Sequence, residues 1–334
     1  MMHVEFLARK EEEHGSADDR KHKVIEEKES YRWIRTLQRA EDQLPVGQHA
    51  LFIQDREADI FALFAAPKRA KSHILVRANQ PRRVEVLPEH TGDQVEHGTL
   101  FDVACAAPVV AQMNVTIPRG REQVQREAIL IIQCAAVRII PPDRKGNGEL
   151  QPVCAWVIRA CELHPPADEE AVEWVLVTTP PIPDGPAACQ MVQYYTRRWR
   201  IERFHYTIKT GGCDAEQLHM DDANSIMLAL ALYYVAAWRL LYIDYYARTQ
   251  PNAFPRAVFR PLEIEVLEMI EKRRIRTLSS AVAAMAKLGG YEPYKNGPLP
   301  GIKVMVEGYS RMEDMESILI IERRRHRRHG AKKI

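Results

Sequence analysis

The sequence predicts an α/β fold, and three stretches of the chain carry that prediction. Residues 50–78 have the pattern strand, helix, strand; residues 80–172 are rich in strand-like runs; and the chain beyond residue 186 is mostly helical in pattern. A strand, helix and strand at this spacing indicate a parallel strand pair joined by a crossover. With 334 residues, 46% of them hydrophobic, the chain can bury a sizeable core in two or three lobes.

The first 80 residues are expected to alternate between strands and helices. Short apolar runs predict strands, and longer runs with helical spacing predict helices. The expected elements are a strand at 3–8, a helix at 26–43, a strand at 50–53 that runs into Gln54 and ends on Asp55, a helix at 58–66 and a strand at 73–78.

Residues 81–170 change character and predict a β-rich insertion. The runs VVAQMNVTI, AILIIQCAAVRII and VCAWVIRA are separated by turn sequences rich in Pro and Gly. A further apolar strand follows at 172–179. From Pro186, which suits the first turn of a helix, we expect one helix to continue to Lys209, where Gly211 and Gly212 end it.

The remainder is expected to be helical to about residue 288 and again in a basic C-terminal segment. Its longest apolar run, IMLALALYYVAAW, stops at Arg239, well short of the roughly 20 residues of a membrane span, and predicts a core helix. The N-terminus MMHVEFLARKEEE has no apolar segment of the kind that signal peptides carry. Six scattered cysteines without a CxxC pair indicate a reduced compartment.

Charge is distributed unevenly, which points to local sites for an anionic partner. The formal net charge is only +2, yet basic side chains gather in residues 194–209 and in the sequence ERRRHRRHGAKK near the end. Along a helix through 194–209, Arg198, Glu202 and Lys209 fall within an arc of about 60° of Tyr195. Such a face is either a solvated surface or a site that handles a polyanion.

Three sequence blocks decide between these alternatives by resemblance. The spacing Tyr195-x2-Arg198-x3-Glu202-x6-Lys209 resembles the YREK signature of bacterial insertion-sequence transposases of the transposon-five, or IS-four, type. The segment QDREADIFALF is similar to that family's DREAD segment, with Asp55 as its catalytic aspartate. Trp174 stands 21 residues before the signature tyrosine, as in the family.

The resemblance implies an RNase H-like core and cut-and-paste DNA transposition. In these enzymes of the DDE class, Asp55 and Glu202 would bind Mg²⁺ or Mn²⁺, which supports in-line phosphoryl transfer on DNA. Arg198 and Lys209 would neutralise phosphates and Tyr195 would donate a hydrogen bond to one. Trp174 would stack on a base extruded from the duplex.

Other residues near these blocks are open to two interpretations. Arg77 is positioned like a DNA contact of the family, although an arginine at a strand end is often an ion-pair partner. Asp59 is expected to be an acid on a helix surface or a support behind the site. Trp199 is as consistent with packing as with a DNA contact, and Tyr206 stands where relatives often carry a further lysine.

The family's first catalytic aspartate has no counterpart at the expected spacing. Only 54 residues precede Asp55, and Asp18, Asp19 and Asp42 are not at the centre of an apolar strand. We therefore expect an N-terminally truncated transposase whose own catalytic competence is uncertain. The alternative is an inactive fragment that binds DNA, dimerises and inhibits full-length transposase; an unrelated two-metal nuclease would need a first-strand acid that the sequence does not provide.

The resemblance also implies an organisation and partners. Residues 1–80 would begin the RNase H-like core, 81–170 would be the insertion, 171–255 would complete the core and 256–334 would be a helical dimerisation region with a basic tail. Relatives tend to carry tryptophan where Val306 and Tyr309 stand. The expected partners are transposon-end DNA, target DNA and a second subunit, either a copy of this chain or full-length transposase, in the cytoplasm at the nucleoid and without a membrane.

Overall fold

The computed structural model describes most of the chain, which divides into two compact units, Met1–Arg198 and Trp199–Ile334. The expected strand at 3–8 and the aspartates Asp18 and Asp19 lie outside the described residues. The described ranges are 24–87, 97–117, 126–143, 150–167, 169–209, 215–220, 222–292 and 299–330, with side chains up to 326.

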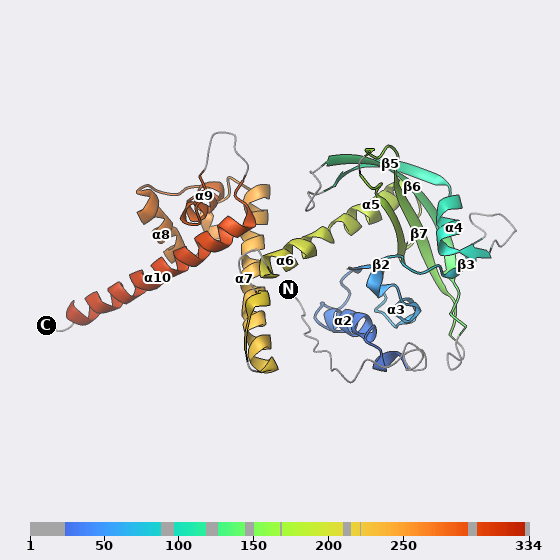
Figure 1. Ribbon diagram of the computed structural model, residues 1–334, viewed down its shortest axis with the longest axis horizontal. Helices are drawn as coiled ribbons and strands as arrows, with labels where there is room; N and C mark the ends of the chain where they lie inside the picture. Colours follow the sequence, from blue (N-terminus) through green and yellow to red (C-terminus); the bar gives the residue numbers. More distant parts are fainter. Residues whose placement is uncertain are drawn as a thin grey trace. The chain divides into compact units, whose positions relative to one another are not determined.

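A mixed eight-stranded sheet forms the centre of the first unit (Figure 1). Its order is β1-β2-β8-β7-β6-β3-β4, with β5 paired to β6. The strands are β1 (Ala50–Gln54), β2 (Ser72–Arg77), β3 (Arg83–Val86), β4 (His97–Thr99), β5 (Val109–Ile117), β6 (Arg126–Ile139), β7 (Val153–Glu162) and β8 (Glu173–Thr178).

The pairing of β1 with β2 is parallel, which confirms the crossover predicted from the sequence. Ala50 lies opposite Ser72 and Gln54 opposite Val76, so both strands run toward the same edge of the sheet. All the other pairings among the described strands are antiparallel. The predicted α/β class is therefore confirmed, with Asp55 directly after the end of a parallel strand.

The β-rich stretch continues the same sheet through β3 to β7. The predicted runs became β5, β6 and β7, while the short strands β3 and β4 and the helix α4 between β4 and β5 were not predicted. The predicted division of the chain into four segments stays a prediction.

Helices of the first unit cover the two faces of the sheet. They are η2 (Ile25–Glu27), α2 (Tyr31–Asp42), η3 (Arg56–Ala58), α3 (Phe61–Ala65), α4 (Leu100–Ala106) and α5 (Gly185–Thr196). One buried cluster joins Ile34 and Leu37 of α2 and Phe64 of α3 to inward side chains of the sheet such as Ile74 and Val177. On α5, Ala188 and Val192 are buried as well.

The second unit is helical in all its described elements. These are α6 (Trp199–Lys209), η5 (Ala215–Gln217), α7 (Ala223–Thr249), η6 (Pro255–Ala257), α8 (Pro261–Glu271), α9 (Leu278–Leu288) and α10 (Ile302–Gly330). The α9 and α10 helices approach closely at glycines, because a Cβ on Gly308 would overlap the carbonyl oxygen of Met285. Glu263 is fully buried in this unit and binds both Arg239 and Arg260.

Residues 226–238 are helical, but much of the surface of this helix is exposed, so the prediction of a core helix is wrong there. These residues belong to the longer α7, in which Leu228 and Leu232 are 67% and 64% exposed. Among the described helices, α7 has the length and composition to cross a membrane, a weak criterion that core helices of soluble proteins also meet. The charged side chains near its C-terminal end are paired within the unit, since Asp244 binds Arg203 and Arg248.

Candidate active site

Asp55 lies immediately after β1 and caps the short helix η3. One carboxylate oxygen, Oδ1, accepts a hydrogen bond from the backbone N–H of Arg56 at 2.6 Å. The side chain as a whole is 38% exposed, so solvent reaches part of the carboxylate. Since ligands of open α/β sheets bind at the carboxyl ends of parallel strands, Asp55 has the expected position of a ligand-binding residue.

Arg198 reaches the same carboxylate from the end of α5. Its Nη1 lies 3.5 Å from Oδ2 of Asp55, across 143 residues of sequence. Arg77 lies at the end of β2, the strand parallel to β1, and donates to the carbonyl oxygen of Glu173 at 3.4 Å. Two guanidinium groups and one carboxylate therefore gather at this edge of the sheet.

An aromatic pair packs beneath these charges. The rings of Trp174 and Tyr195 meet edge to face with centroids 5.6 Å apart, and the guanidinium of Arg198 lies 5.7 Å from the centre of the Tyr195 ring. Burial raises the pKa of the Tyr195 phenol, while the charges of Arg198 and Arg77 act in the opposite direction. The ring of Tyr195, with Trp174 against it, therefore forms the surface over which the guanidinium of Arg198 lies.

Burial limits what the two aromatic residues offer to DNA in this conformation. Tyr195 is 3% and Trp174 is 7% exposed. Stacking of Trp174 on an extruded base, or donation by the Tyr195 hydroxyl to a phosphate, would require both side chains to become more accessible. These two roles stay predictions.

The single helix expected from Pro186 to Lys209 is wrong, because the chain forms two helices with a turn at residues 197–198. At the end of α5 the backbone N–H groups of Arg197 and Arg198 bond three residues back, to Tyr194 and Tyr195, which tightens the last turn. No Gly or Pro marks this turn. The shared face predicted for one continuous helix therefore does not hold across this turn. Ile201, which one continuous helix would put on the opposite, apolar face, is 49% exposed.

Glu202 and Lys209 belong to α6, in the second unit. Glu202 is exposed in the first turn of the helix. Lys209 is in the last turn, 60% exposed, with Nζ 3.1 Å from Glu216. Arg203 anchors the helix to α7 through Asp244 at 2.9 Å. Of the seven predicted site residues, five therefore gather in the first unit and these two lie in the second.

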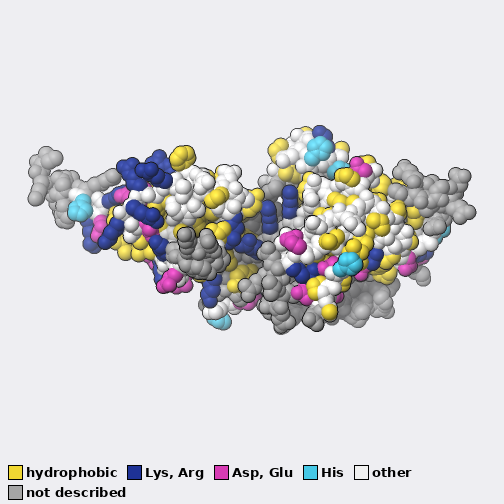
Figure 2. Space-filling view, turned by 90° about the horizontal axis from the view of Figure 1, so that it is seen from above, with side chains coloured by type: hydrophobic (Ala, Val, Ile, Leu, Met, Phe, Trp, Pro, Cys, Tyr) yellow, Lys and Arg dark blue, Asp and Glu magenta, His cyan; other side chains and the backbone are white. Residues whose placement is uncertain are grey.

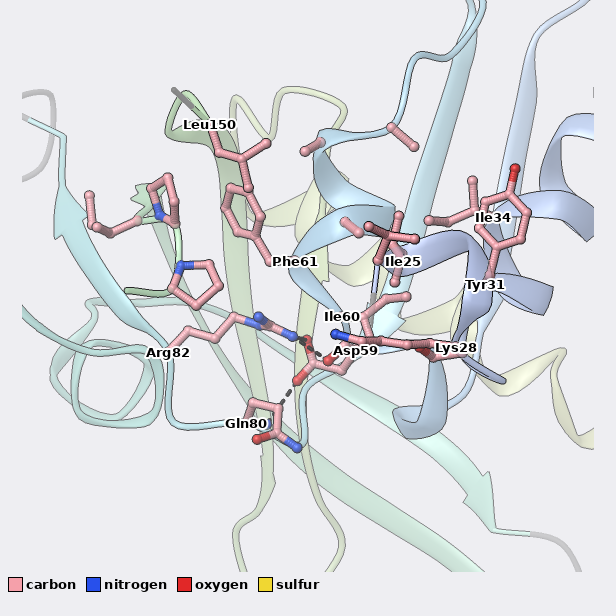
Figure 3. Close-up of a pocket in the computed structure, with 18 of the residues that line it drawn as sticks. Ile25, Lys28, Tyr31, Ile34, Asp59, Ile60, Phe61, Gln80, Arg82 and Leu150 are labelled. Carbon is pink, nitrogen blue, oxygen red and sulfur yellow. Dashed lines mark hydrogen bonds and ion pairs between the residues drawn. The ribbon is translucent and has the colours of Figure 1, made fainter. Parts of the chain in front are cut away.

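Asp59, four residues after Asp55, is a buried structural acid and not a helix-surface one. Its carboxylate accepts from the backbone N–H groups of Asn79 and Gln80 at 2.7 and 2.8 Å and from Nε of Arg82 at 2.9 Å. Figure 3 shows the contacts of Asp59 with Gln80 and Arg82 beside a pocket of about 930 Å³ between α2, α3 and the chain after β2. Asp59 thereby fixes the segment that follows Arg77.

The donor set is suited to a hard divalent cation but is divided between the units. Mg²⁺ prefers carboxylate and water oxygens and is often held by one or two carboxylates. Within the described residues no group of three or more His, Cys, Asp and Glu side chains is arranged to hold a metal ion. Asp55 supplies a partly exposed carboxylate in the first unit, with Oδ2 facing Arg198, and the exposed Glu202 carries the other candidate carboxylate.

The comparison with protein families identifies the class of this chain. Residues 6–238, more than half of the sequence, match the family model described as the transposase DDE domain. The chain belongs to this family. Membership implies nuclease and strand-transfer chemistry on DNA and binding of transposon ends. The direct contact between Asp55 and Arg198 was not predicted from the sequence. The signal that could have indicated it is that the two residues belong to two blocks that resemble the same family.

Proposed function

We propose that the chain acts in cut-and-paste transposition, with Asp55 and Glu202 as the carboxylates that bind Mg²⁺ or Mn²⁺. The observation that supports this most is the gathering of Asp55, Arg198, Tyr195 and Trp174 from segments that are far apart in sequence. Two of these positions belong to the block that resembles the YREK signature. Together with family membership, this favours an insertion-sequence transposase of the transposon-five type with an RNase H-like core.

The residues divide the chemistry between them. A bound divalent ion would stabilise charge on the transferring phosphoryl group and activate the attacking oxygen. Asp55 and Glu202 would hold the ions. Arg198, Arg77 and Lys209 would pair with phosphate oxygens and keep the scissile strand in register. The planar guanidinium groups of the two arginines are well suited to this role.

The basic part of α10 supports DNA binding outside the reaction centre. Arg323, Arg324, Arg325 and His326 are exposed, although Arg323 also contacts Glu265. Figure 2 shows Lys and Arg side chains gathered over the helical unit, at the left of the view. We expect this helix to hold the DNA backbone with an affinity that falls steeply with salt.

Dimerisation is proposed through the groove between α8 and α10. Exposed apolar side chains line it, among them Met269 (59%), Met315 (39%) and Ile318 (58%). Tyr309, at a position where relatives tend to carry tryptophan, is 7% exposed inside the unit and donates to Glu263, so it would not lie on this surface. The partner would be a second copy or a longer transposase.

The decisive experiment is a cleavage assay on a transposon-end duplex with Mg²⁺ or Mn²⁺, scored for release of a 3′-OH. Wild type is compared with Asp55→Asn and Glu202→Gln. Matched controls are Glu57→Gln, two residues from Asp55, and Glu307→Gln, an exposed helical glutamate of the second unit. The proposal expects the first pair to lose about 10²–10³-fold in rate, the scale of one lost electrostatic contact in a preorganised site, and the controls to retain it.

A second outcome separates the two candidate functions. If wild type binds the duplex but releases no 3′-OH, the alternative of a DNA-binding and dimerising inhibitor of full-length transposase is favoured. Addition of the chain to an active transposase should then reduce its cleavage, and Arg324→Ala with Arg325→Ala should weaken that effect. Cleavage that survives both Asp55→Asn and Glu202→Gln would overturn the assignment of these carboxylates.

A further inference from the structure

The ion pair between Asp55 and Arg198 occupies the oxygen that a metal ion would need. Oδ1 of Asp55 already accepts from the N–H of Arg56 at 2.6 Å, and Oδ2 faces Nη1 of Arg198 at 3.5 Å. A divalent ion bound at Oδ2 would lie next to the guanidinium charge. Metal and arginine are therefore competitors for one carboxylate oxygen.

The contact between Asp55 and Arg198 is weak enough for a stronger partner to displace it. Charge-assisted hydrogen bonds between a guanidinium and an anion are typically about 2.7–2.9 Å long, and the 3.5 Å separation is well beyond that range. Asp55 is 38% exposed, so solvent weakens the attraction. A phosphate offers Arg198 a bidentate partner of higher charge, which Asp55 cannot match once one of its oxygens is bound to Arg56.

The surroundings let Arg198 exchange partners without disturbing the fold. The residue lies in the turn after α5, and its guanidinium rests over the ring of Tyr195, which Trp174 supports from the edge. The aromatic pair would keep the arginine at this edge of the sheet while its outer nitrogens turn from carboxylate to phosphate. Asp55 keeps its own position through the cap on η3.

We propose that Arg198 is a positioning residue that covers Asp55 until a DNA phosphate binds it, so that DNA and the divalent ion bind this site cooperatively. The inference rests on the proposed function, because it takes Asp55 as a metal ligand. By linkage, DNA must tighten the metal by the same factor as the metal tightens DNA. Free protein would thereby hold little metal at Asp55, and the ion would enter with its substrate.

The test measures Mn²⁺ binding to the full chain by electron paramagnetic resonance, with and without a transposon-end duplex. The Asp55 site is defined as the binding lost in Asp55→Asn under the same conditions, which also subtracts Mn²⁺ held by the duplex itself. In wild type we expect the duplex to tighten this site about 10-fold, within the usual range of coupling between two ligands. In Arg198→Gln we expect Mn²⁺ to bind this site tightly without DNA, and we expect the duplex to tighten that binding by less than about 2-fold.

Arg56→Gln is the matched control for charge. It removes an equal charge from an exposed side chain next to Asp55, and it keeps the backbone N–H that donates to Oδ1 of Asp55. We expect Arg56→Gln to keep the wild-type dependence on DNA. Equal tightening in Arg56→Gln and Arg198→Gln would reduce the effect to general electrostatics and overturn the proposal.

Two further outcomes separate this inference from the proposed function. Mn²⁺ binding that Asp55→Asn abolishes, but that neither DNA nor Arg198→Gln changes, would overturn the competition and leave Asp55 as a metal ligand. Absence of any Asp55-dependent Mn²⁺ binding, with or without DNA, would overturn both. Thermal unfolding of each variant verifies that the protein measured is folded.

Discussion

The two parts of the candidate site are built in different ways. The part in the first unit is embedded: Asp55 caps a turn at a strand end, Arg198 lies beside it, and Tyr195 and Trp174 are almost fully buried. The part in the second unit is a surface helix, because α6 buries only Thr207 and Ile208 of its 11 residues.

This difference predicts two kinds of mutational effect. Side chains around Asp55 share their contacts with the fold, so changes there should alter stability as well as binding. Side chains on the exposed face of α6 take little part in packing, so changes there should alter DNA binding or catalysis without changing stability. The exposed carboxylate of Glu202 and the 60% exposed Lys209 are in the second group.

The largest expected effect on stability is that of Asp59→Ala. The change removes a fully buried carboxylate, strands the guanidinium of Arg82 and leaves the N–H groups of Asn79 and Gln80 without their acceptor. Breaking a buried pair from one side costs about 3–5 kcal/mol. Urea unfolding of the first unit measures it, with Asp55→Ala as the matched control; an equal loss in both would contradict the distinction between the two aspartates.

A second large effect should appear as sensitivity of the first unit to acid. Glu162 is 2% exposed, and its hydrogen bonds from Arg126 hold the pKa of its carboxyl below the usual value. The pair therefore stabilises the fold above the unfolded-state pKa, and this contribution is lost as pH falls through the lower folded-state pKa. Glu162→Gln should destabilise by about 3 kcal/mol at neutral pH and flatten the pH dependence between about 5 and 3.

The measurement is the thermal midpoint of wild type and Glu162→Gln across that pH range. Glu127→Gln is a suitable control, because Glu127 is an exposed acid of β6 that accepts a hydrogen bond from the hydroxyl of Thr116. A constant difference between wild type and Glu162→Gln at every pH would contradict a role of the Glu162 charge.

A smaller effect is expected when α6 loses its contact with α7. The rings of Phe204 and Tyr234 meet edge to face at 5.1 Å, and such pairs contribute about 0.5–1.5 kcal/mol beyond area burial. Phe204→Ala should therefore increase hydrogen exchange of α6 amides severalfold while leaving the sheet unchanged. Tyr206→Ala, on the exposed side of the same helix, should change neither; protection lost equally in both variants would show that α6 is held by something else.

Sequence patterns predicted the strands well because burial there is periodic or continuous. The run VVAQMNVTI became β5 at its exact limits, and ALFI and HILVRA became the parallel pair. The short strands β3 and β4 carry too few residues for a pattern. β3 pairs with β6, about 50 residues further on, and β4 pairs with β3. Local propensity could not supply that information.

The candidate site was predictable only as far as residue types and spacing allow. The blocks around Asp55 and Tyr195 indicated which side chains to bring together, and five of the seven do gather. The turn at residues 197–198 was not predictable, since its sequence has good helix formers and no breaker. The turn coincides with contacts of Arg198 with Asp55 and with the ring of Tyr195, and local sequence does not encode the first of these, which is long-range.

The smallest effect tests the exposed part of the site, through Lys209→Ala. The side chain is 60% exposed and its pair with Glu216 is exposed too, so the loss should not change stability measurably. If Lys209 neutralises one phosphate, the plot of log affinity for a transposon-end duplex against log salt should lose about one unit of slope. Fluorescence anisotropy between about 50 and 200 mM salt measures it. Lys287→Ala is the control, because Lys287 pairs with Glu271 elsewhere in the unit and should leave the slope unchanged. An unchanged slope in Lys209→Ala would remove this residue from the DNA interface and leave the embedded part of the site and the basic part of α10 as the proposed phosphate contacts.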